Sequence, residues 1–403
     1  MRELSVPVRL SLYSEDWKAR RVMTMSGRSI LLCTCLLTSI PLRASPFSDQ
    51  EAGPGQPASW TLYVENDSFL KTDRYYTNGI RLTKSFGKDG LPRWAHRTRW
   101  IQPVLDQVHL CRQDESNRSC FNYETAWTFG QNIYTPNDLR TSRLLRSQRP
   151  YGAWLYYGNV LTLSNPDQQH SLEIDAGDVG GSLALGQPVQ SRWHALLRSI
   201  KNSDTPPDPK GWGHQINNQP GLQVLYQRRQ RWLDRQTPCG LRADLVPQLN
   251  AAFGTVNVQA SVGATVRFGY NVPNDFPDDL TIPSPPPPPE PEGPPGVALA
   301  SYHQTPPFEA WAPSHKERRW EAYLFARADR RYVAYNAFLD GNINVFGRSQ
   351  SVTKDPLVTD LQVGAVLGRR HWRCSLTVVD RSPEFKAQRD HQRFVSITVL
   401  RRR

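Results

Sequence analysis

Short segments in which apolar and polar residues alternate recur along most of this 403-residue chain. Residues 60–64 and 79–83 begin the series, and residues 394–400 end it. Alternation with a period of two places one class of side chain on each face of a strand. A set of such strands can close into a barrel whose apolar face meets lipid and whose polar face points inward.

We predict twelve strands from this pattern, most of them long enough for a tilted membrane crossing of about nine to eleven residues. They are residues 60–64, 79–83, 123–134, 151–163, 170–178, 221–232, 241–254, 256–270, 320–335, 352–368, 371–380 and 394–400. No run of about 18 apolar residues follows the N-terminal region, so helical spans are not expected. The predicted fold is all-β, a transmembrane antiparallel β-barrel of about 12 strands, with both termini on one side.

One segment has helical rather than strand periodicity. In residues 189–200 the apolar side chains recur at i, i+4, i+7, i+8 and i+11, which predicts a short helix in a loop, and His194 lies beside this stripe. With the termini in the periplasm, the outer face receives the loops at residues 66–77, 135–150 and 339–348, together with this helix.

The N-terminal region has the features of a secretory signal. Residues 29–42 are an apolar stretch behind Arg20, Arg21 and Arg28, followed by Arg43-Ala44-Ser45. We therefore assign residues 1–45 to a signal peptide with an N-terminal extension, and residues 46–403 to an outer-membrane barrel. Residues 272–315 are Pro-rich and are expected to form an extended loop within it.

Charge and cysteine content fit an exported protein. The formal charge is +12 and stays positive without residues 1–45, which suits phosphorylated glycolipid or lipid headgroups; export removes most of the case for nucleic acid. Spacing favours a disulfide between Cys111 and Cys120. Cys239 and Cys374 are either a second pair or lone strand residues.

A dense polar cluster lies between the first two predicted strands. It contains Asn66, Asp67, Asp73, Arg74, Thr77 and Asn78. These residues are either a site or a solvated loop, and His194 is either a catalytic or a structural histidine. Imidazole is a common proton acceptor for a nucleophile that attacks an ester, and carboxylate and amide oxygens suit Ca²⁺. The chemistry of these groups together suggests ester hydrolysis.

Seven short motifs carry a resemblance that covers the chain from about Trp60 onward. They are Glu65-Asn66-Asp67, residues 72–79 (TDRYYTNG), residues 130–136 (GQNIYTP), Arg149-Pro150-Tyr151, Val189-Gln190 with His194, Gly211-Trp212 with Gln215, and residues 338–342 (FLDGN). In this order they resemble the outer-membrane lipid A 3'-O-deacylase family. The resemblance implies a twelve-stranded barrel that uses Ca²⁺ to remove the 3'-linked acyloxyacyl chain of lipid A.

The resemblance also implies roles for individual residues. His194 becomes the general base, with Asn66, Asp67 and Thr77 around the ester and Asp67 and Asn66 as Ca²⁺ ligands. Arg140 would hold a lipid A phosphate or the oxyanion, Ser182 would stand for a serine that the family places before the histidine, and the nucleophile is either water or that serine. The chain departs from the family at Ser147-Gln148, Gly152-Ala153 and Gly180-Gly181, and it lacks a terminal aromatic residue.

Other functions agree with the same residues. An outer-membrane phospholipase needs similar groups. A catalytically silent pore or adhesin needs only the barrel, and a secreted soluble β-protein is disfavoured by the aromatic-rich strands.

Overall fold

The computed structural model describes residues 59–70, 74–88, 121–180, 183–200, 208–277, 320–343, 347 and 349–402. The chain divides into an N-terminal unit, Met1–Asp49, and a second unit, Gln50–Arg403. The predicted signal peptide, the predicted Cys111–Cys120 disulfide and residues 278–315 of the Pro-rich segment lie outside the described residues.

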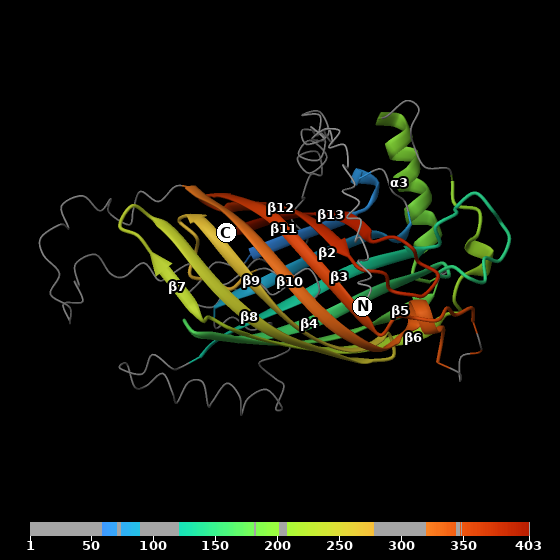
Figure 1. Ribbon diagram of the computed structural model, residues 1–403, viewed down its shortest axis with the longest axis horizontal. Coiled ribbons are helices and arrows are strands. Elements are labelled where there is room, and N and C mark those ends of the chain that lie inside the picture. The colour runs from blue at the N-terminus through green and yellow to red at the C-terminus, as the bar shows by residue number, and fades with distance from the viewer. Residues whose placement is uncertain are drawn as a thin grey trace, which may run out of the picture. The chain divides into compact units, whose positions relative to one another are not determined.

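Twelve long antiparallel strands in the second unit form a closed barrel (Figure 1). They are β1 (Ser59–Asn66), β2 (Tyr75–Lys88), β3 (Asn122–Thr135), β4 (Gly152–Ser164), β5 (Gln168–Gly180), β6 (Gln219–Gln230), β8 (Leu241–Gly254), β9 (Asn257–Tyr270), β10 (Trp320–Asn336), β11 (Leu357–Arg369), β12 (Trp372–Arg381) and β13 (Gln392–Arg402). Each strand pairs with the next one along the barrel, and the β1–β13 and β6–β8 pairings complete the ring. The predicted fold class is confirmed.

Most predicted elements are found with small shifts of their ends, but the second strand, predicted over residues 79–83, extends from Tyr75 to Lys88. The predicted helix corresponds to α3 (Gly186–Ile200). The last third of the chain shows one clear error, because residues 352–356 precede β11 rather than belong to it. Four short elements were not predicted. They are β7 (Leu233–Gln236), which pairs only with β8, the 3-10 turns η1 (Ser68–Leu70) and η3 (Trp212–His214), and α4 (Ala337–Asp340).

The strand directions separate the loops into two groups. The β1–β2, β3–β4, β5–β6 and β10–β11 connections lie at one end, which we call the loop end. The first residue of β1 and the last residue of β13 lie at the opposite end, which we call the terminal end. The predicted convergence of four polar segments at one end is therefore confirmed, and Figure 1 shows α3 rising there beside the sheet.

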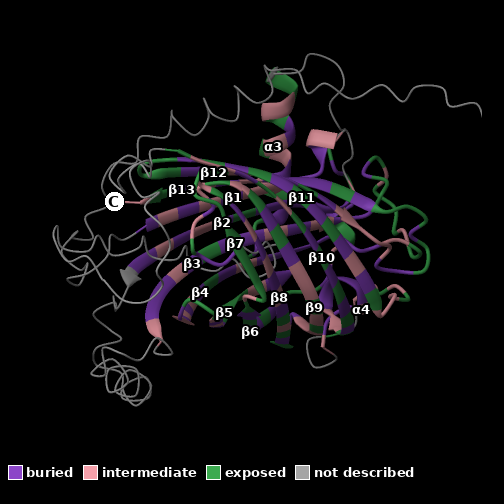
Figure 2. Cartoon of the chain, turned by 60° about the vertical axis from the view of Figure 1, so that its left-hand side comes forward, coloured by how far each residue is buried: buried purple, intermediate pink, exposed green. Residues whose placement is uncertain are grey.

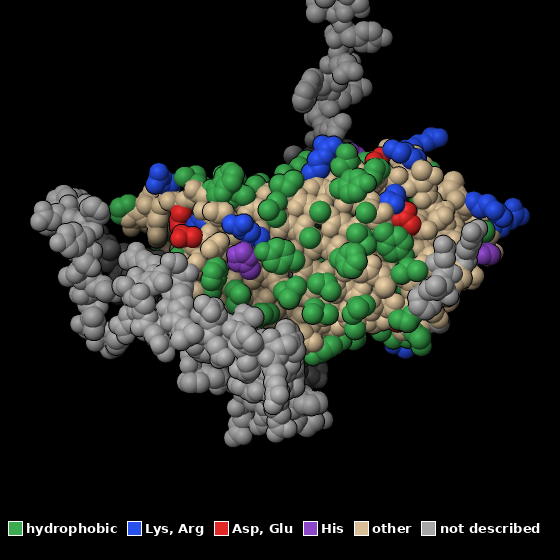
Figure 3. All heavy atoms as spheres, turned by 90° about the horizontal axis from the view of Figure 1, so that it is seen from below, with side chains coloured by type: hydrophobic (Ala, Val, Ile, Leu, Met, Phe, Trp, Pro, Cys, Tyr) green, Lys and Arg blue, Asp and Glu red, His purple; other side chains and the backbone are tan. Residues whose placement is uncertain are grey.

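The two faces of the barrel wall differ as the alternation predicts. On β11 the side chains of Val358, Asp360 and Gln362 are buried inside, whereas Leu361 and Val363 are exposed outside. Figure 2 shows the same alternation of buried and exposed positions along other strands. On the face drawn in Figure 3, hydrophobic side chains cover the middle of the wall and charged ones lie mainly toward its ends. Within the described part of the chain, no helix has both the length and the apolar character needed to cross a bilayer.

The interior contains many buried ion pairs. They include Arg81–Glu173, Arg149–Glu384, Arg267–Asp244, Arg331–Asp360 and Arg381–Asp360, with N–O distances of 2.5 to 3.0 Å. A charge inside a barrel is stable only when a partner compensates for its lost hydration. These pairs occupy the space that a pore would need.

The two remaining described cysteines are not paired. Cys239 lies in the turn between β7 and β8, and Cys374 lies on β12, and both are free and exposed. The alternative of a Cys239–Cys374 disulfide is therefore wrong. β8, which follows Cys239, is not a neighbour of β12 in the barrel, so the two thiols do not face each other across one pair of strands.

Residues 271–277 fold back over the terminal end of the wall and are held by arginines. The carboxylate of Asp275 accepts bonds of 2.7 Å from both Arg267 and Arg373. The Arg231 guanidinium lies 5.1 Å from the centre of the Phe276 ring and donates to the backbone oxygen of Asp275 at 2.9 Å. Burial alone would raise the pKa of Asp275, but Arg373 and Arg267 outweigh it and lower the pKa from 3.8 to about 2.

The Asp275 ion pairs should make barrel stability depend on pH in acid. Because the folded-state pKa lies below the ordinary value, the stabilisation is complete above about pH 4 and is lost as the pH falls toward 2. It amounts to ~2 kcal/mol. The measurement is the temperature at which the folded barrel loses its compact, heat-resistant band in a gel. At pH 6 we expect the Asp275→Asn variant to lose this band at a lower temperature than the wild type. At pH 2.5 we expect the temperature difference between them to be smaller. A difference that stays constant over this range would contradict the assignment.

Candidate active site

The β1–β2 connection is fixed by its own side chains. The side-chain oxygen of Asn66 accepts a bond from the backbone N–H of Ser68 at 2.8 Å, which starts the η1 turn. A carboxylate oxygen of Asp67 accepts from the backbone N–H of Arg74 at 2.7 Å. Asn66 and Asp67 are both buried, and the Asn66 amide nitrogen has no hydrogen-bond partner among the described residues. The turn therefore holds a carboxylate and an amide nitrogen in a protected place.

Thr77 occupies a β-bulge. Tyr76 pairs with Tyr134 and Asn78 pairs with Ile133, so Thr77 is an extra residue on β2. A bulge redirects a side chain, and here the Thr77 hydroxyl lies 2.7 Å from that of Thr135. On β3, Ile133 points outward, and Thr135, two residues later, points the same way. The Thr77 hydroxyl that contacts Thr135 therefore also lies on the outer wall.

The interior side of the same strands supports the bulge. Tyr76 points into the barrel and donates a hydrogen bond to the Glu65 carboxylate. Glu65 pairs with Gly79 across β1 and β2, and the Tyr76 hydroxyl occupies the space that a side chain at Gly79 would need. The residues that precede Asn66 and Thr77 are thus bonded to each other behind the wall.

The segment that contains α3 covers the outer wall of β3 and β4. Ile133 and Ala153 point outward yet are fully buried, because Ala184 and Trp212 pack on them. The Gln131 side chain donates to the backbone oxygen of Ala184 at 2.5 Å. This part of the wall is therefore a packed interface rather than a lipid-facing surface.

The face of α3 that is turned to the wall is polar. Gly186, Gln190 and His194 are buried at intervals of four residues, and Gln190 accepts a bond from the Trp212 indole at 2.9 Å. In the apolar stripe used to predict the helix, Val189, Trp193, Leu196 and Leu197 are only partly buried. Trp193, next to His194, contacts Phe69 of η1 with ring centroids 6.5 Å apart. The helix with His194 and the turn with Asp67 are thus in direct contact.

The predicted site residues have different surroundings. Asn66, Asp67, Thr77 and His194 are all buried at the loop end, on elements that contact one another. Arg140 is exposed in the β3–β4 connection, where its backbone N–H binds the Asp138 carboxylate at 3.0 Å. Ser182 lies outside the described residues.

Sequence reasoning placed Gln131, Thr135 and Gln190 in motifs but did not predict their contacts in this interface. The first two are within the GQNIYTP motif, and Gln190 stands four residues before His194, so the helical period could have indicated it.

A buried arginine connects two loops beside the site. Arg149 is fully buried, donates to Glu384 of the β12–β13 connection at 2.9 Å, and stacks 4.8 Å from the Tyr134 ring centre. Burial alone would raise the pKa of Glu384, but Arg149, Arg381 and Arg331 together lower it. Glu384 therefore stays ionised and keeps the Arg-Pro-Tyr segment in place.

The described side chains offer a limited ligand set for a cation. No group of three or more His, Cys, Asp or Glu side chains close enough to share a metal ion occurs among them. Asp67 supplies one buried carboxylate, and Thr77 and Thr135 supply hydroxyl oxygens on the wall beside it. Oxygen donors of this kind are the ligands that Ca²⁺ takes, whereas zinc sites are typically built from nitrogen and sulfur ligands.

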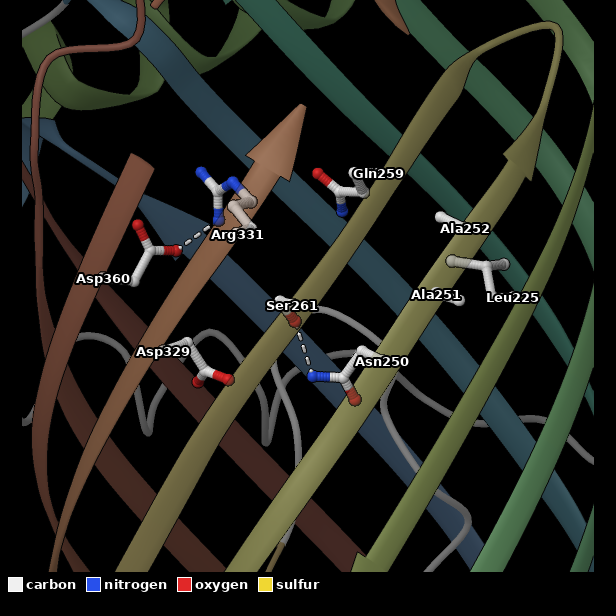
Figure 4. Close-up of a pocket in the computed structure, with 9 residues that line it drawn as sticks. All are labelled: Leu225, Asn250, Ala251, Ala252, Gln259, Ser261, Asp329, Arg331 and Asp360. Atoms are coloured by element: carbon white, nitrogen blue, oxygen red, sulfur yellow. Dashed lines mark hydrogen bonds and ion pairs between the residues drawn. The ribbon is translucent and has the colours of Figure 1, made fainter. Parts of the chain in front are cut away.

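Two cavities lie inside the barrel rather than on this wall. The larger, about 160 Å³, is bordered by Glu65, Tyr76 and Arg381. The smaller, about 20 Å³, has room for about one water molecule. Figure 4 shows Arg331 bonded to Asp360 at its edge. Neither cavity includes His194, so we place the candidate site on the outer wall.

The closed barrel with an apolar exterior and a polar site under a loop-end helix defines an integral outer-membrane protein of the β-barrel class. The family model described as "Outer membrane protein LpxR" matches residues 30–403. The chain belongs to this LpxR family and is located in the outer membrane.

Among solved structures, "LpxR from Salmonella typhimurium" aligns with a TM-score of 0.58 and 20% identity, covering 85% of this chain and 99% of that one. This likeness shows that the two share a fold. The β domain of the Bordetella autotransporter BrkA aligns over 86% of this chain and 98% of its own, with 6% identity and a TM-score of 0.35, too low to bear on the comparison. No curated protein matches the chain in sequence.

Replacement of Gly79 by Ala tests the packing behind the bulge. The added methyl group would meet the Tyr76 hydroxyl, so we expect a loss of stability of about 1–3 kcal/mol from overpacking. The measurement is the temperature at which the compact gel band is lost. The matched control is Gly213→Ala in η3, where nothing lies within 4 Å of the new atom. Equal effects of the two substitutions would argue against a crowded Tyr76–Gly79 contact.

Proposed function

We propose that this protein is a calcium-dependent esterase that removes the 3'-linked acyloxyacyl chain of lipid A in the outer leaflet of the outer membrane. The observation that carries the proposal is the burial of His194 on the face of α3 that packs on the outer wall, while the neighbouring Trp193 contacts Phe69 in the turn that follows Asn66 and Asp67. Membership in the LpxR family supports lipid A as the substrate.

The candidate site lies on the outer wall of the barrel, where a membrane lipid is the substrate that can reach it directly. Acyl chains of the outer leaflet lie along the exposed apolar side chains of the wall, among them Ile80 and Phe129 on β2 and β3. Toward the loop end these strands continue into Asn78 and Gln131. An ester near the headgroup can therefore reach the site while its chain remains in hydrocarbon.

His194 acts as the general base in the proposed reaction. Its imidazole takes a proton from water as the water oxygen bonds to the ester carbonyl carbon, and it returns that proton to the sugar oxygen as the carbon–oxygen bond breaks. The products are a free fatty acid and a sugar hydroxyl. Packing of α3 on the wall excludes bulk water and fixes the direction of the ring.

Asp67, Asn66 and Thr77 hold the other side of the ester. Asp67 and neighbouring oxygen atoms would bind Ca²⁺, which supplies Lewis-acid stabilisation of the negative charge that develops on the carbonyl oxygen. The Asn66 amide nitrogen, buried and available as a donor, can stabilise the same charge. Arg140 is exposed at the rim, where a guanidinium suits a lipid A phosphate.

Substitution of the base gives the direct test of activity. We expect His194→Ala to lower deacylation by about 10²- to 10⁴-fold, the usual contribution of a general base. The measurement is mass spectrometry of lipid A from cells that produce each variant. His214→Ala, which removes an exposed imidazole from the same β5–β6 connection, is the control and should retain activity.

The same experiment separates the alternatives. Unchanged lipid A in cells with the folded wild-type barrel would defeat the proposal, and loss of phospholipid acyl chains instead would identify a phospholipase. The compact gel band verifies that each variant has folded.

Calcium dependence should show the signature of a weak site. With one buried carboxylate, we expect half-maximal activity at about 10⁻⁴ to 10⁻³ M Ca²⁺ and loss of activity with a chelator. Asp67→Asn should raise the required Ca²⁺ at least about tenfold. Asp208→Asn, at an exposed residue paired with Arg198, should leave the requirement unchanged. Full activity in excess chelator would remove calcium from the mechanism.

A further inference from the structure

One row of the strand register crosses seven adjacent strands with tryptophan and a cation in strict alternation. Each member is directly paired with the next across the sheet. The row consists of Trp127 (β3), Lys84 (β2), Trp60 (β1), Arg401 (β13), Trp372 (β12), Arg369 (β11) and Trp320 (β10). We call these seven residues the Trp–cation row.

The members of the row contact one another on the outer face. Lys84 lies 5.5 Å from the Trp60 ring centre, Arg401 lies 5.4 Å from that of Trp372, and Arg369 lies 4.7 Å from that of Trp320. Trp60 also meets Trp127 edge to face at 5.4 Å. Cation–π contacts of this kind hold the charged groups beside the rings instead of letting them move freely in solvent.

The row follows the edge of the lipid-facing surface toward the terminal end. Trp320 and Trp372 begin their strands and Arg369 ends β11. On the loop side of the row, the next outward positions are apolar, for example Leu62 on β1 and Leu367 on β11. The cations therefore lie where hydrocarbon gives way to headgroups, in the leaflet opposite to the candidate active site.

The chemistry of the row favours anionic headgroups. Tryptophan alone prefers any membrane interface, but every second position here adds a positive charge, with cations two strands or about 10 Å apart. No member of the row is acidic, and the nearby Glu321 carboxylate is bonded to Arg373. The row offers no carboxylate to the ammonium group of a zwitterionic lipid, and the rings of Trp60, Trp320 and Trp372 already contact the row's own cations.

We propose that the Trp–cation row is a binding strip for the phosphate groups of anionic phospholipids. Because the row includes β1, β2 and β3, the lipids bound there hold the same wall that carries Asn66 and Thr77. Trp60 and Asn66 are six residues apart on one strand, about 20 Å, so the strip sets the depth of the site in the bilayer.

Native mass spectrometry of the full-length protein in neutral detergent tests the strip. The probes are phosphatidylglycerol and phosphatidylcholine with identical acyl chains. The wild type should bind phosphatidylglycerol more tightly. The triple variant Lys84→Gln, Arg369→Gln, Arg401→Gln should bind it about tenfold or more weakly, since each cation near the surface contributes severalfold.

The control removes three exposed cations from elsewhere on the barrel, with Arg228→Gln, Arg235→Gln and Arg330→Gln. It should keep the preference for phosphatidylglycerol. Equal losses in the two triple variants, or no preference in the wild type, would overturn the proposal. If the first triple variant fails to form the compact gel band, the double variant Arg369→Lys, Arg401→Lys replaces it. A retained preference for phosphatidylglycerol supports a strip that acts through charge. A lost preference for phosphatidylglycerol overturns the proposal.

Discussion

Closure of the sheet is the constraint on which the rest of the structure depends. In hydrocarbon, every backbone N–H and C=O must bond within the protein, so a sheet with an open edge cannot cross a membrane. The β1–β13 and β6–β8 pairings meet this requirement and leave β7 outside the ring. In a closed barrel every strand has one face toward the lipid and one toward the interior. Charged side chains on the inner face must therefore pair with groups of opposite charge. The arginine–carboxylate pairs inside the barrel are the consequence.

The same constraint explains why the candidate site lies on the outside. A wall filled on its inner side by ion pairs offers little space for a lipid, whereas its outer side is already adjacent to acyl chains. The bulge at Thr77 is a local exception to the strand period, and it turns a hydroxyl toward the outer wall without breaking the ring. The Glu65–Tyr76 bond behind it stabilises that irregularity from the interior.

The fold was predictable from the sequence to a greater extent than the site. Period-two alternation is a local property, so β8 was located at its true ends and most other strands within about two residues. Residues 352–356 were wrongly assigned to a strand because Val352 and Thr353 are residues that strands favour. Asp355 and Pro356 are poor strand residues and indicated the opposite. The motifs identified Asn66, Asp67, Thr77 and His194 as candidates, but the pattern gave no distance between them.

What the sequence could not indicate is which face of α3 packs on the barrel. Its apolar stripe predicted the helix but not its orientation, and the buried positions are Gly186, Gln190 and His194, beside the stripe. A helix in water hides its apolar side, but a helix at a membrane surface can leave that side partly exposed to lipid. On α3 polar and apolar side chains share the packed side, because Val189 contacts the cluster that contains Ile133 and Ala153, and Trp193 contacts Phe69 of η1. The helix is therefore anchored through both polar and apolar side chains, which fixes the position of the buried His194 on the wall.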